Sequence, residues 1–210
     1  MVTKAVSRTR KSTGAALLLL AQAASAGGIL GIDHRLGVDN DGIWARRQQH
    51  IILGTMVTSE ILFGLWEGGD SRLGRTDWQA IDASLISAVS SEAMKRIFRR
   101  ARPNSTDNPN EWFRTSRDRS FPSAEVAAMS AIVTPFMLEY GHDHPWVYAL
   151  EILPAYDGYA RMKTRGHWQS DVLAGFLVGT AAGYYTHQRN SSFTLSLMPH
   201  GVQIGYRTRW

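Results

Sequence analysis

The sequence predicts an all-α fold, a single helical bundle of about five to six core helices followed by a C-terminal β-hairpin. Apolar residues recur at helical spacing in several segments, and in the first they form one stripe of Ile52, Met56, Ile61 and Leu65. Near the C-terminus the pattern changes to alternation on both sides of Pro199-His200-Gly201, which is typical of two strands joined by a turn. The 210 residues, 44% of them hydrophobic and 20% charged, fit one globular domain.

Turn residues divide the chain into five helical segments, which we expect at about residues 43–66, 76–100, 122–140, 145–162 and 169–188. Gly68-Gly69 ends the first segment. Pro103 stops the second, because the residue before a proline avoids the helical conformation. Pro135 lies inside the third segment and is expected to kink it. Residues 104–120 contain three Asn, two Asp and no aliphatic side chain, so we expect a loop there.

The first 26 residues have the pattern of a secretory signal peptide. Basic residues up to Lys11 precede an apolar run at residues 15–21 and a small-residue site at Ala24-Ser25-Ala26. No charge occurs between Lys11 and Asp33, so an uncleaved membrane anchor is the alternative. Either segment would direct the following chain out of the cytoplasm. We therefore expect a periplasmic protein with a helical domain at 27–190 and a hairpin at 191–210.

The net charge of +5 is concentrated at the N-terminus. Four of the 23 basic residues precede residue 27, which leaves 19 basic against 18 acidic residues, a net charge of +1, in the rest of the chain. A nucleic-acid-binding domain usually carries a basic stripe over its folded surface, so we expect no nucleic-acid partner. The chain contains no cysteine, which excludes a disulfide framework and a thiolate metal site.

His167 and Asp171 are the first candidates for catalysis. They lie four residues apart at the start of the fifth helical segment, so their side chains share one face of the helix. A carboxylate bonded to one ring nitrogen fixes the tautomer and leaves the other nitrogen free to act as a nucleophile or base. The alternative is that both residues serve only to cap the helix and to interact with its dipole.

Two further clusters carry groups that bind anions. Lys95 and Arg102 are two helical turns apart and can together hold an oxyanion, although a solvated basic helix end is the common alternative. Ser123 begins the third helical segment, where free backbone amides and its hydroxyl form an anion pocket, with Glu125 in the first turn. Ordinary capping by Ser123 is the alternative there.

Taken in order, these clusters closely resemble the three-part signature of the type 2 phosphatidic acid phosphatase superfamily, written KxxxxxxRP, PSGH and SRxxxxxHxxxD. The superfamily includes bacterial acid phosphatases, lipid phosphate phosphatases and vanadium haloperoxidases. The resemblance spans residues 95–171 and, through the helical bundle, about 40–188; the terminal hairpin lies outside it. The matching residues are Lys95, Arg102, Pro103, Pro122, Ser123, Arg161, His167 and Asp171, whereas Ala124, Glu125 and Ala160 depart from the pattern.

The resemblance implies a role for each matching residue. Phosphoryl oxygens would be bound by the cations and the start of the helix, that is by Lys95, Arg102, Arg161, Ser123 and the amide of Ala124. His167 would attack phosphorus to form a phosphohistidine, and Asp171 would orient its ring. No metal and no cofactor are implied, because the cations and amides neutralise the charge that magnesium neutralises in other phosphoryl-transfer enzymes.

Glu125 stands where the superfamily signature has the histidine that protonates the leaving oxygen. A carboxylic acid can act as this catalytic acid if burial raises its pKa, but neighbouring Lys and Arg side chains would keep it ionised. The acid step then runs at low pH, or the leaving group is as good as a diphosphate, or turnover has been lost. A simpler alternative is that Glu125 only caps the helix or pairs with an arginine.

These patterns predict an exported, metal-independent phosphatase acting on a phosphomonoester or a diphosphate. The partner would be a phosphate-bearing small molecule or a lipid head group, with peripheral contact to the membrane surface. Two alternatives stay open: a catalytically silent phosphate or lipid-phosphate binding protein, which the departure at Glu125 favours, and a vanadate-dependent haloperoxidase, since the same pocket holds vanadate.

Overall fold

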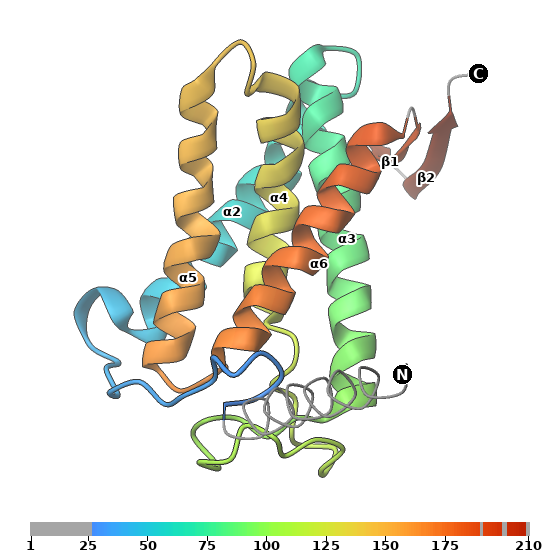
Figure 1. Cartoon of the computed structure of the whole chain (residues 1–210). Helices are drawn as coiled ribbons and strands as arrows, with labels where there is room; N and C mark the ends of the chain where they lie inside the picture. The colour runs from blue at the N-terminus through green and yellow to red at the C-terminus, as the bar shows by residue number, and fades with distance from the viewer. Residues whose placement is uncertain (1–26, 190, 199–200, 209–210) are drawn as a thin grey trace, which may run out of the picture.

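The protein is described here as a computed structural model that covers residues 27–189, 191–198 and 201–208. Up to residue 189 the described chain forms five α-helices and two short 3-10 helices (Figure 1). In chain order they are η1 (Gly42–Trp44), α2 (Arg46–Glu67), α3 (Arg72–Phe98), α4 (Ala124–Tyr140), η2 (Pro145–Glu151), α5 (Ile152–Lys163) and α6 (Gln169–Gln188). The helical part of the prediction is therefore confirmed. The predicted signal peptide at residues 1–26 lies outside the described residues.

Helix α4 is the centre of the bundle, because it contacts α3 and α6 extensively and also meets α2 and α5. Its sequence is small and apolar, and it supplies a large share of the fully buried side chains, among them Val126, Ala127, Met129 and Ala131. The helix continues through Pro135 to Tyr140 as one element. The core thus lies along α4, and the other helices surround it.

A row of glycines on α6 sets how closely this helix approaches α4. Gly175, Gly179 and Gly183 follow one another at four-residue spacing, so they lie on one face of the helix. A Cβ atom at Gly175 would lie 2.5 Å from the Ser123 carbonyl oxygen, and one at Gly179 would lie 2.2 Å from the Ala127 carbonyl oxygen. The two backbones are therefore in direct contact, and the N-terminus of α6 is held beside the N-terminus of α4.

Two helix boundaries differ from the sequence expectation. Helix α3 begins at Arg72, ahead of the expected start at residue 76, because the side chain of Ser71 accepts a hydrogen bond from the Gly74 amide and caps the helix. The segment from Pro145 was expected to be one helix, but its first seven residues form η2. Pro154 then falls in the first turn of α5, where its missing N–H costs no intrahelical hydrogen bond.

The fold class needs one correction, which concerns the predicted C-terminal hairpin. The fold is helical, and the hairpin is not supported as part of it. The described backbone pairs β1 (Ser191–Met198) with β2 (Gly201–Thr208), but in the described residues this ribbon has no third strand, and it projects at the side of the bundle (Figure 1). A two-stranded ribbon by itself is marginally stable in water, so alternation of residues alone does not establish a structural unit.

The loops that matter for function gather at one end of the bundle. The C-terminal ends of α3 and α5, the N-terminal ends of α4 and α6, and the segments 27–41 and 99–123 all lie at the lower end in Figure 1. Within the described chain, no helix has the length and apolar character needed to cross a bilayer.

Candidate active site

His167 lies in the short connection between α5 and α6, and only 4% of its surface is exposed. Its backbone amide donates to the Arg161 carbonyl oxygen at 3.3 Å, which holds the connection against the end of α5. Burial lowers the pKa of His167 to about 3, and the charges of Arg161 and Lys95 act in the same direction. The imidazole is therefore neutral near pH 7, which is the form that a nucleophile requires.

Asp171 lies one turn into α6 and is fully buried. Its Oδ2 atom accepts hydrogen bonds from Ser120 Oγ at 2.5 Å and from the Trp168 amide at 2.9 Å, and it lies 3.7 Å from His167 Nδ1. The last distance is too long for a hydrogen bond. Nδ1 nevertheless faces the carboxylate, so Nε2 is the ring nitrogen that remains for the reaction. Asp171 therefore both caps α6 and lies behind the histidine ring.

Arg100 holds this carboxylate in place, although sequence analysis did not select it. The guanidinium is fully buried and pairs with Asp171 Oδ1 and with Asp33 Oδ2, both at 2.6 Å. It also lies 4.4 Å from the centroid of the Trp112 ring. The only local signal was its position between Arg99 and Arg102, where three arginines close together do not indicate which one turns inward.

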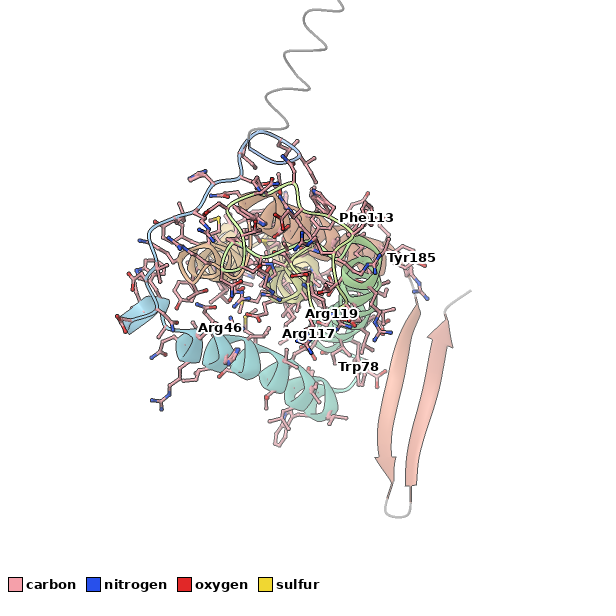
Figure 2. The ribbon with its side chains drawn as sticks, turned by 90° about the horizontal axis from the view of Figure 1, so that it is seen from below. Arg46, Trp78, Phe113, Arg117, Arg119 and Tyr185 are labelled. Carbon is pink, nitrogen blue, oxygen red and sulfur yellow. The ribbon has the colours of Figure 1, made fainter. Side chains whose placement is uncertain are left out.

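Lys95 and Arg102 fix the loop that leads into α4. Lys95 Nζ donates to the carbonyl oxygens of Pro122 at 2.6 Å and Arg119 at 2.9 Å, and Arg102 donates to those of Gly166 at 3.0 Å and Arg119 at 3.2 Å. Figure 2 looks onto this end of the bundle, with Arg119 labelled. Burial lowers the pKa of both side chains, that of Lys95 to about 8. Their mutual repulsion adds to the shift for Lys95, so a bound anion would stabilise both charges.

Arg161 is the third cation, and it projects from the last turn of α5. A Cβ atom at residue 166 would lie 2.5 Å from Arg161 Nη2, so Gly166 leaves the space that the guanidinium occupies. Its Nε atom is buried without a hydrogen-bond partner, 3.9 Å from Glu125 Oε2. Burial lowers the pKa of Arg161 to about 10. The group is therefore charged at neutral pH and has an unused donor.

The N-terminus of α4 differs from simple capping. Ser123 occupies the N-cap position, yet its side chain makes no cap hydrogen bond, and its hydroxyl oxygen is buried without a partner. Its backbone amide is already used, because it donates to the Asp171 carbonyl oxygen at 2.9 Å. The amides of Ala124 and Glu125 belong to the first helical turn, where no intrahelical acceptor exists. The hydroxyl of Ser123 and the amide of Ala124 are thus the groups that can bind an anion here.

Glu125 is engaged in an ion pair that sequence analysis did not identify. Arg46, at the start of α2, donates to both of its carboxylate oxygens, at 2.5 and 2.7 Å (Arg46 is labelled in Figure 2). Burial alone would raise the pKa of Glu125, but the hydrogen bonds from Arg46 and the charge of Arg161 outweigh it and lower this pKa to about 2. Glu125 is therefore ionised at neutral pH, which corresponds to the arginine-pairing alternative and disfavours a proton-donor role there.

Asp157 is a second acidic residue that sequence analysis missed. It lies one turn before Arg161 on α5, it is fully buried, and neither carboxylate oxygen has a hydrogen-bond partner. Burial, followed by the charge of Glu125, raises the pKa of Asp157 to about 7. An aspartate in the middle of a helical segment is usually exposed, so the sequence carried no signal that Asp157 would be buried.

The PAP2 superfamily pattern matches residues 78–194, which include every residue of the three clusters. The chain belongs to the PAP2 superfamily. A protein named lipid A 1-phosphatase, from Porphyromonas gingivalis, is 36% identical over 92 residues, which make up 43% of this chain and 18% of that protein. The chain thus matches less than a fifth of its relative's length. A crystal structure of LpxE from Aquifex aeolicus aligns with a TM-score of 0.45 at 20% identity, covering 71% of this chain and 98% of that one.

The structure brings the PAP2 motif residues into one buried corner at the end of the bundle. Lys95, Arg102 and Arg161 all lie close enough to His167 to depress its pKa. Within the described residues, no group of three or more His, Cys, Asp or Glu side chains is arranged to hold a metal ion. The structure adds five residues that sequence analysis did not select and that contact, or lie beside, the charged side chains of the motif: Asp33, Arg46, Arg100, Ser120 and Asp157.

Proposed function

We propose that this chain is a phosphatase that cleaves a phosphate ester or a diphosphate through a phosphohistidine at His167. The observation that carries the proposal is a neutral, buried imidazole whose Nδ1 faces a fixed carboxylate while Lys95, Arg102 and Arg161 surround it. Membership of the PAP2 superfamily supports the same assignment.

Binding of the phosphoryl group follows from the electrostatics of the corner. Lys95, Arg102 and Arg161 are cations that burial disfavours, so a phosphate dianion between them would recover the charge stabilisation lost from water. The hydroxyl of Ser123 and the amide of Ala124 would donate to the remaining oxygens. These donors are fixed before the reaction, so they stabilise the charge of the transition state at little reorganisation cost.

The chemical step uses the ring nitrogen that points away from Asp171. His167 Nε2 forms a bond to phosphorus as the bond to the leaving oxygen breaks, and the positive charge that develops on the ring is stabilised by Asp171. Water then attacks phosphorus, the P–N bond breaks, and phosphate is released with regeneration of the neutral imidazole. Arg100 keeps Asp171 ionised and in position during both steps.

The ionised state of Glu125 limits which leaving groups the site can release. A carboxylate paired with Arg46 does not release a proton at neutral pH, so the substrates favoured are those whose leaving oxygen needs little protonation, such as a diphosphate. We propose a phosphorylated lipid as the substrate because the relative from Porphyromonas gingivalis is named a lipid A 1-phosphatase. Export to the periplasm, with contact to the membrane surface, remains part of the proposal and rests on the pattern of residues 1–26.

A catalytically silent lipid-phosphate binding protein is the second candidate. The Arg46–Glu125 pair favours it, because the residue aligned with the expected general acid is neutralised by an ion pair.

Labelling with an alkaline quench tests the proposal. The full chain is mixed with a ³²P-labelled lipid diphosphate, quenched in alkaline detergent and digested at alkaline pH, where a phosphohistidine is stable. The label is then located by peptide mapping, and it should be released when the labelled peptide is treated with acid. We expect label on His167 in the wild type, none in His167→Ala, and a turnover rate in the variant lower by about 10⁴-fold or more. Phosphate binding without label or turnover in the wild type would assign the silent binding function. Turnover that His167→Ala retains would exclude the histidine mechanism.

A further inference from the structure

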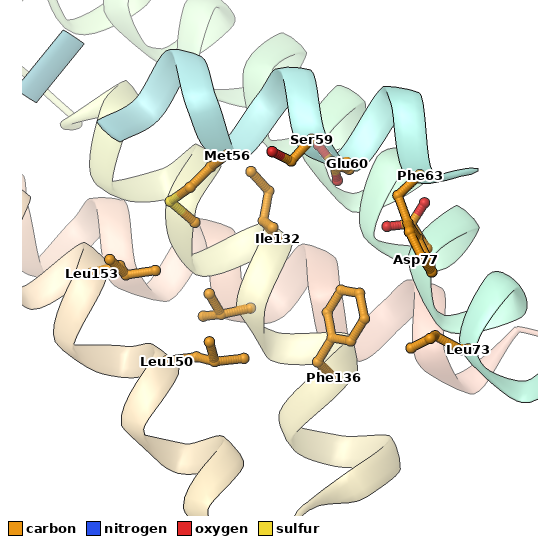
Figure 3. A pocket seen from close by; sticks show the side chains of 11 residues that line it. Met56, Ser59, Glu60, Phe63, Leu73, Asp77, Ile132, Phe136, Leu150 and Leu153 are labelled. Atoms are coloured by element: carbon orange, nitrogen blue, oxygen red, sulfur yellow. The ribbon is translucent and has the colours of Figure 1, made fainter. Parts of the chain in front are cut away.

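A cavity lies away from the phosphate corner, between α2, α3, α4 and the η2–α5 segment (Figure 3). Its volume is about 470 Å³, within the range of small-molecule sites in proteins. Most of its wall is apolar and is built by Met56, Phe63, Ile132, Phe136, Leu150 and Leu153. Such a wall fits a hydrocarbon chain.

Two acidic side chains interrupt this apolar wall. Glu60 on α2 and Asp77 on α3 both line the cavity and are 6% and 3% exposed (Figure 3). Ser84 Oγ donates to the two oxygens of Glu60 at 3.0 and 3.3 Å, whereas Asp77 Oδ2 is buried without a hydrogen-bond partner. Burial raises the pKa of Glu60 to about 8 and that of Asp77 to about 7.

No cation of the described chain neutralises these two carboxyl groups. Each is shifted by burial, and Asp77 raises the pKa of Glu60 further, while no lysine or arginine in the described residues contributes to either shift or pairs with either group. A buried carboxylate pair normally finds a cation or a metal ion. The complementary ligand therefore carries a positively charged N–H donor and an apolar remainder.

We infer that this cavity binds an amphiphilic primary amine, with the ammonium group between Glu60 and Asp77 and the alkyl chain along Met56 and Phe136. Ile132 and Phe136 lie seven and eleven residues beyond Glu125 on α4, about 10 and 16 Å along the helix axis. The ligand therefore occupies a site separate from the phosphate corner, and the inference does not depend on the proposed function.

Calorimetric titration of the full chain with three ligands of equal chain length tests this site. Decylamine, decanol and decanoate differ only in the head group, and titration at pH 8.5 keeps the amine protonated. We expect decylamine to bind about tenfold or more tightly than decanol, and decanoate to bind weakest, because only the ammonium group can pair with the carboxylates.

Two variants and one control locate the head group. Glu60→Gln and Asp77→Asn keep the side-chain shape, and each should weaken decylamine about tenfold or more while leaving decanol unchanged. Glu67→Gln removes a carboxylate from the same helix outside the cavity and should leave both affinities unchanged. Equal binding of the three ligands, or unchanged decylamine affinity in both cavity variants, would overturn the inference and leave an ordinary apolar cavity.

The wild type alone provides an independent measurement. Below the pKa of about 8 of Glu60, binding of an ammonium ion must release a carboxyl proton, so decylamine affinity should fall by up to about tenfold per pH unit from pH 8 to pH 6. Decanol affinity should stay constant over the same range. A decylamine affinity that does not change with pH would contradict ionic recognition, even if the variants failed to fold.

Discussion

Two buried acidic sites, one at each side of α4, differ in whether the protein supplies a cation. Asp171 is fully buried, yet Arg100, Ser120 and the Trp168 amide all bind its carboxylate. Burial alone would raise the pKa of Asp171, but His167, Arg100 and Ser120 lower it. Glu60 and Asp77 are almost equally buried without such a cation, and their pKa values are raised. Burial alone therefore does not decide the charge of a carboxyl group; the neighbouring cation does.

Removing the cation from the first site should have the largest effect. Arg100→Met leaves the carboxylates of Asp33 and Asp171 buried and unpaired, so we expect the free energy of unfolding to fall by about 3–5 kcal/mol, measured by urea denaturation at pH 7. Arg96→Met is the control, because the Arg96 side chain is 68% exposed and its pair with Glu92 contributes little. A loss below about 1 kcal/mol for Arg100→Met would mean that the ion pairs do not hold the site together.

Asp33 and Asp171 provide a matched comparison within the same ion-pair network. Both pair with Arg100 at 2.6 Å, but only Asp171 lies beside His167. Asp171→Asn should lower kcat by about 10²-fold or more through loss of the charge that stabilises the ring, whereas Asp33→Asn should lower mainly stability. Steady-state kinetics at a temperature where both variants are folded measures the difference. Equal kcat losses would assign Asp171 a purely structural role.

Variants of Glu125 test whether pairing with an arginine prevents a carboxyl group in the active site from donating a proton. Because Arg46 keeps it ionised, Glu125→Gln should slow p-nitrophenyl phosphate and alkyl phosphates alike, by about tenfold or less. Arg46→Gln is the companion variant: it removes the hydrogen bonds that lower the pKa of Glu125, so this pKa should rise, and alkyl phosphates should be slowed less than p-nitrophenyl phosphate as the pH falls. Selective slowing of the alkyl phosphates by Glu125→Gln, together with activity that falls as pH rises, would instead make Glu125 the proton donor.

The second acidic site should reveal itself in the pH dependence of stability. Glu60 holds its proton in the folded state up to about pH 8 but loses it near pH 4.5 in the unfolded chain, so its contribution to stability is lost as pH rises between these values. Glu60→Gln should reduce this slope, and its free energy of unfolding relative to the wild type should rise by about 3–5 kcal/mol between pH 5 and pH 9, because each unit of pKa shift corresponds to about 1.4 kcal/mol. Urea denaturation across this pH range measures it, with Glu67→Gln as control. Parallel pH profiles for wild type and Glu60→Gln would contradict the raised pKa.

Two kinds of site residue could be predicted from the sequence: those whose partners are near in the chain, and those that belong to the three-part PAP2 signature. The four-residue spacing of His167 and Asp171 and the seven-residue spacing of Lys95 and Arg102 predicted that each pair lies close together, but the shared helix face expected for each pair is not present. His167 lies in the connection before α6, and Arg102 lies beyond the end of α3 at Phe98. The order of the three clusters supplied Arg161 and Ser123. The helices could be placed because Pro and Gly mark their ends, although the cap at Ser71 was missed.

The rest of the site depends on contacts between distant segments, for which a single sequence has no local pattern. Arg46 reaches Glu125 across 79 residues, and Asp33 reaches Arg100 across 67. Whether a charged residue turns inward is decided by the packing of helices, so Arg100 and Asp157 could not be distinguished from surface residues. The alternating residues beyond 190 led to a hairpin prediction for the same reason, since alternation describes a local period and not a packed neighbour.

The glycine contacts between α6 and α4 have a consequence for the way the protein opens. Since Gly175 and Gly179 place two backbones in contact, the end of α6 that follows His167 and the end of α4 that carries Ser123 cannot separate without exposing the central core. Amide hydrogens of α4 and α6 should therefore exchange with deuterium together, at a rate set by global unfolding, while those of the more peripheral α2 exchange earlier. Partial opening on the α2 side would then expose the acidic cavity while the nucleophile and the anion-binding amides stay together.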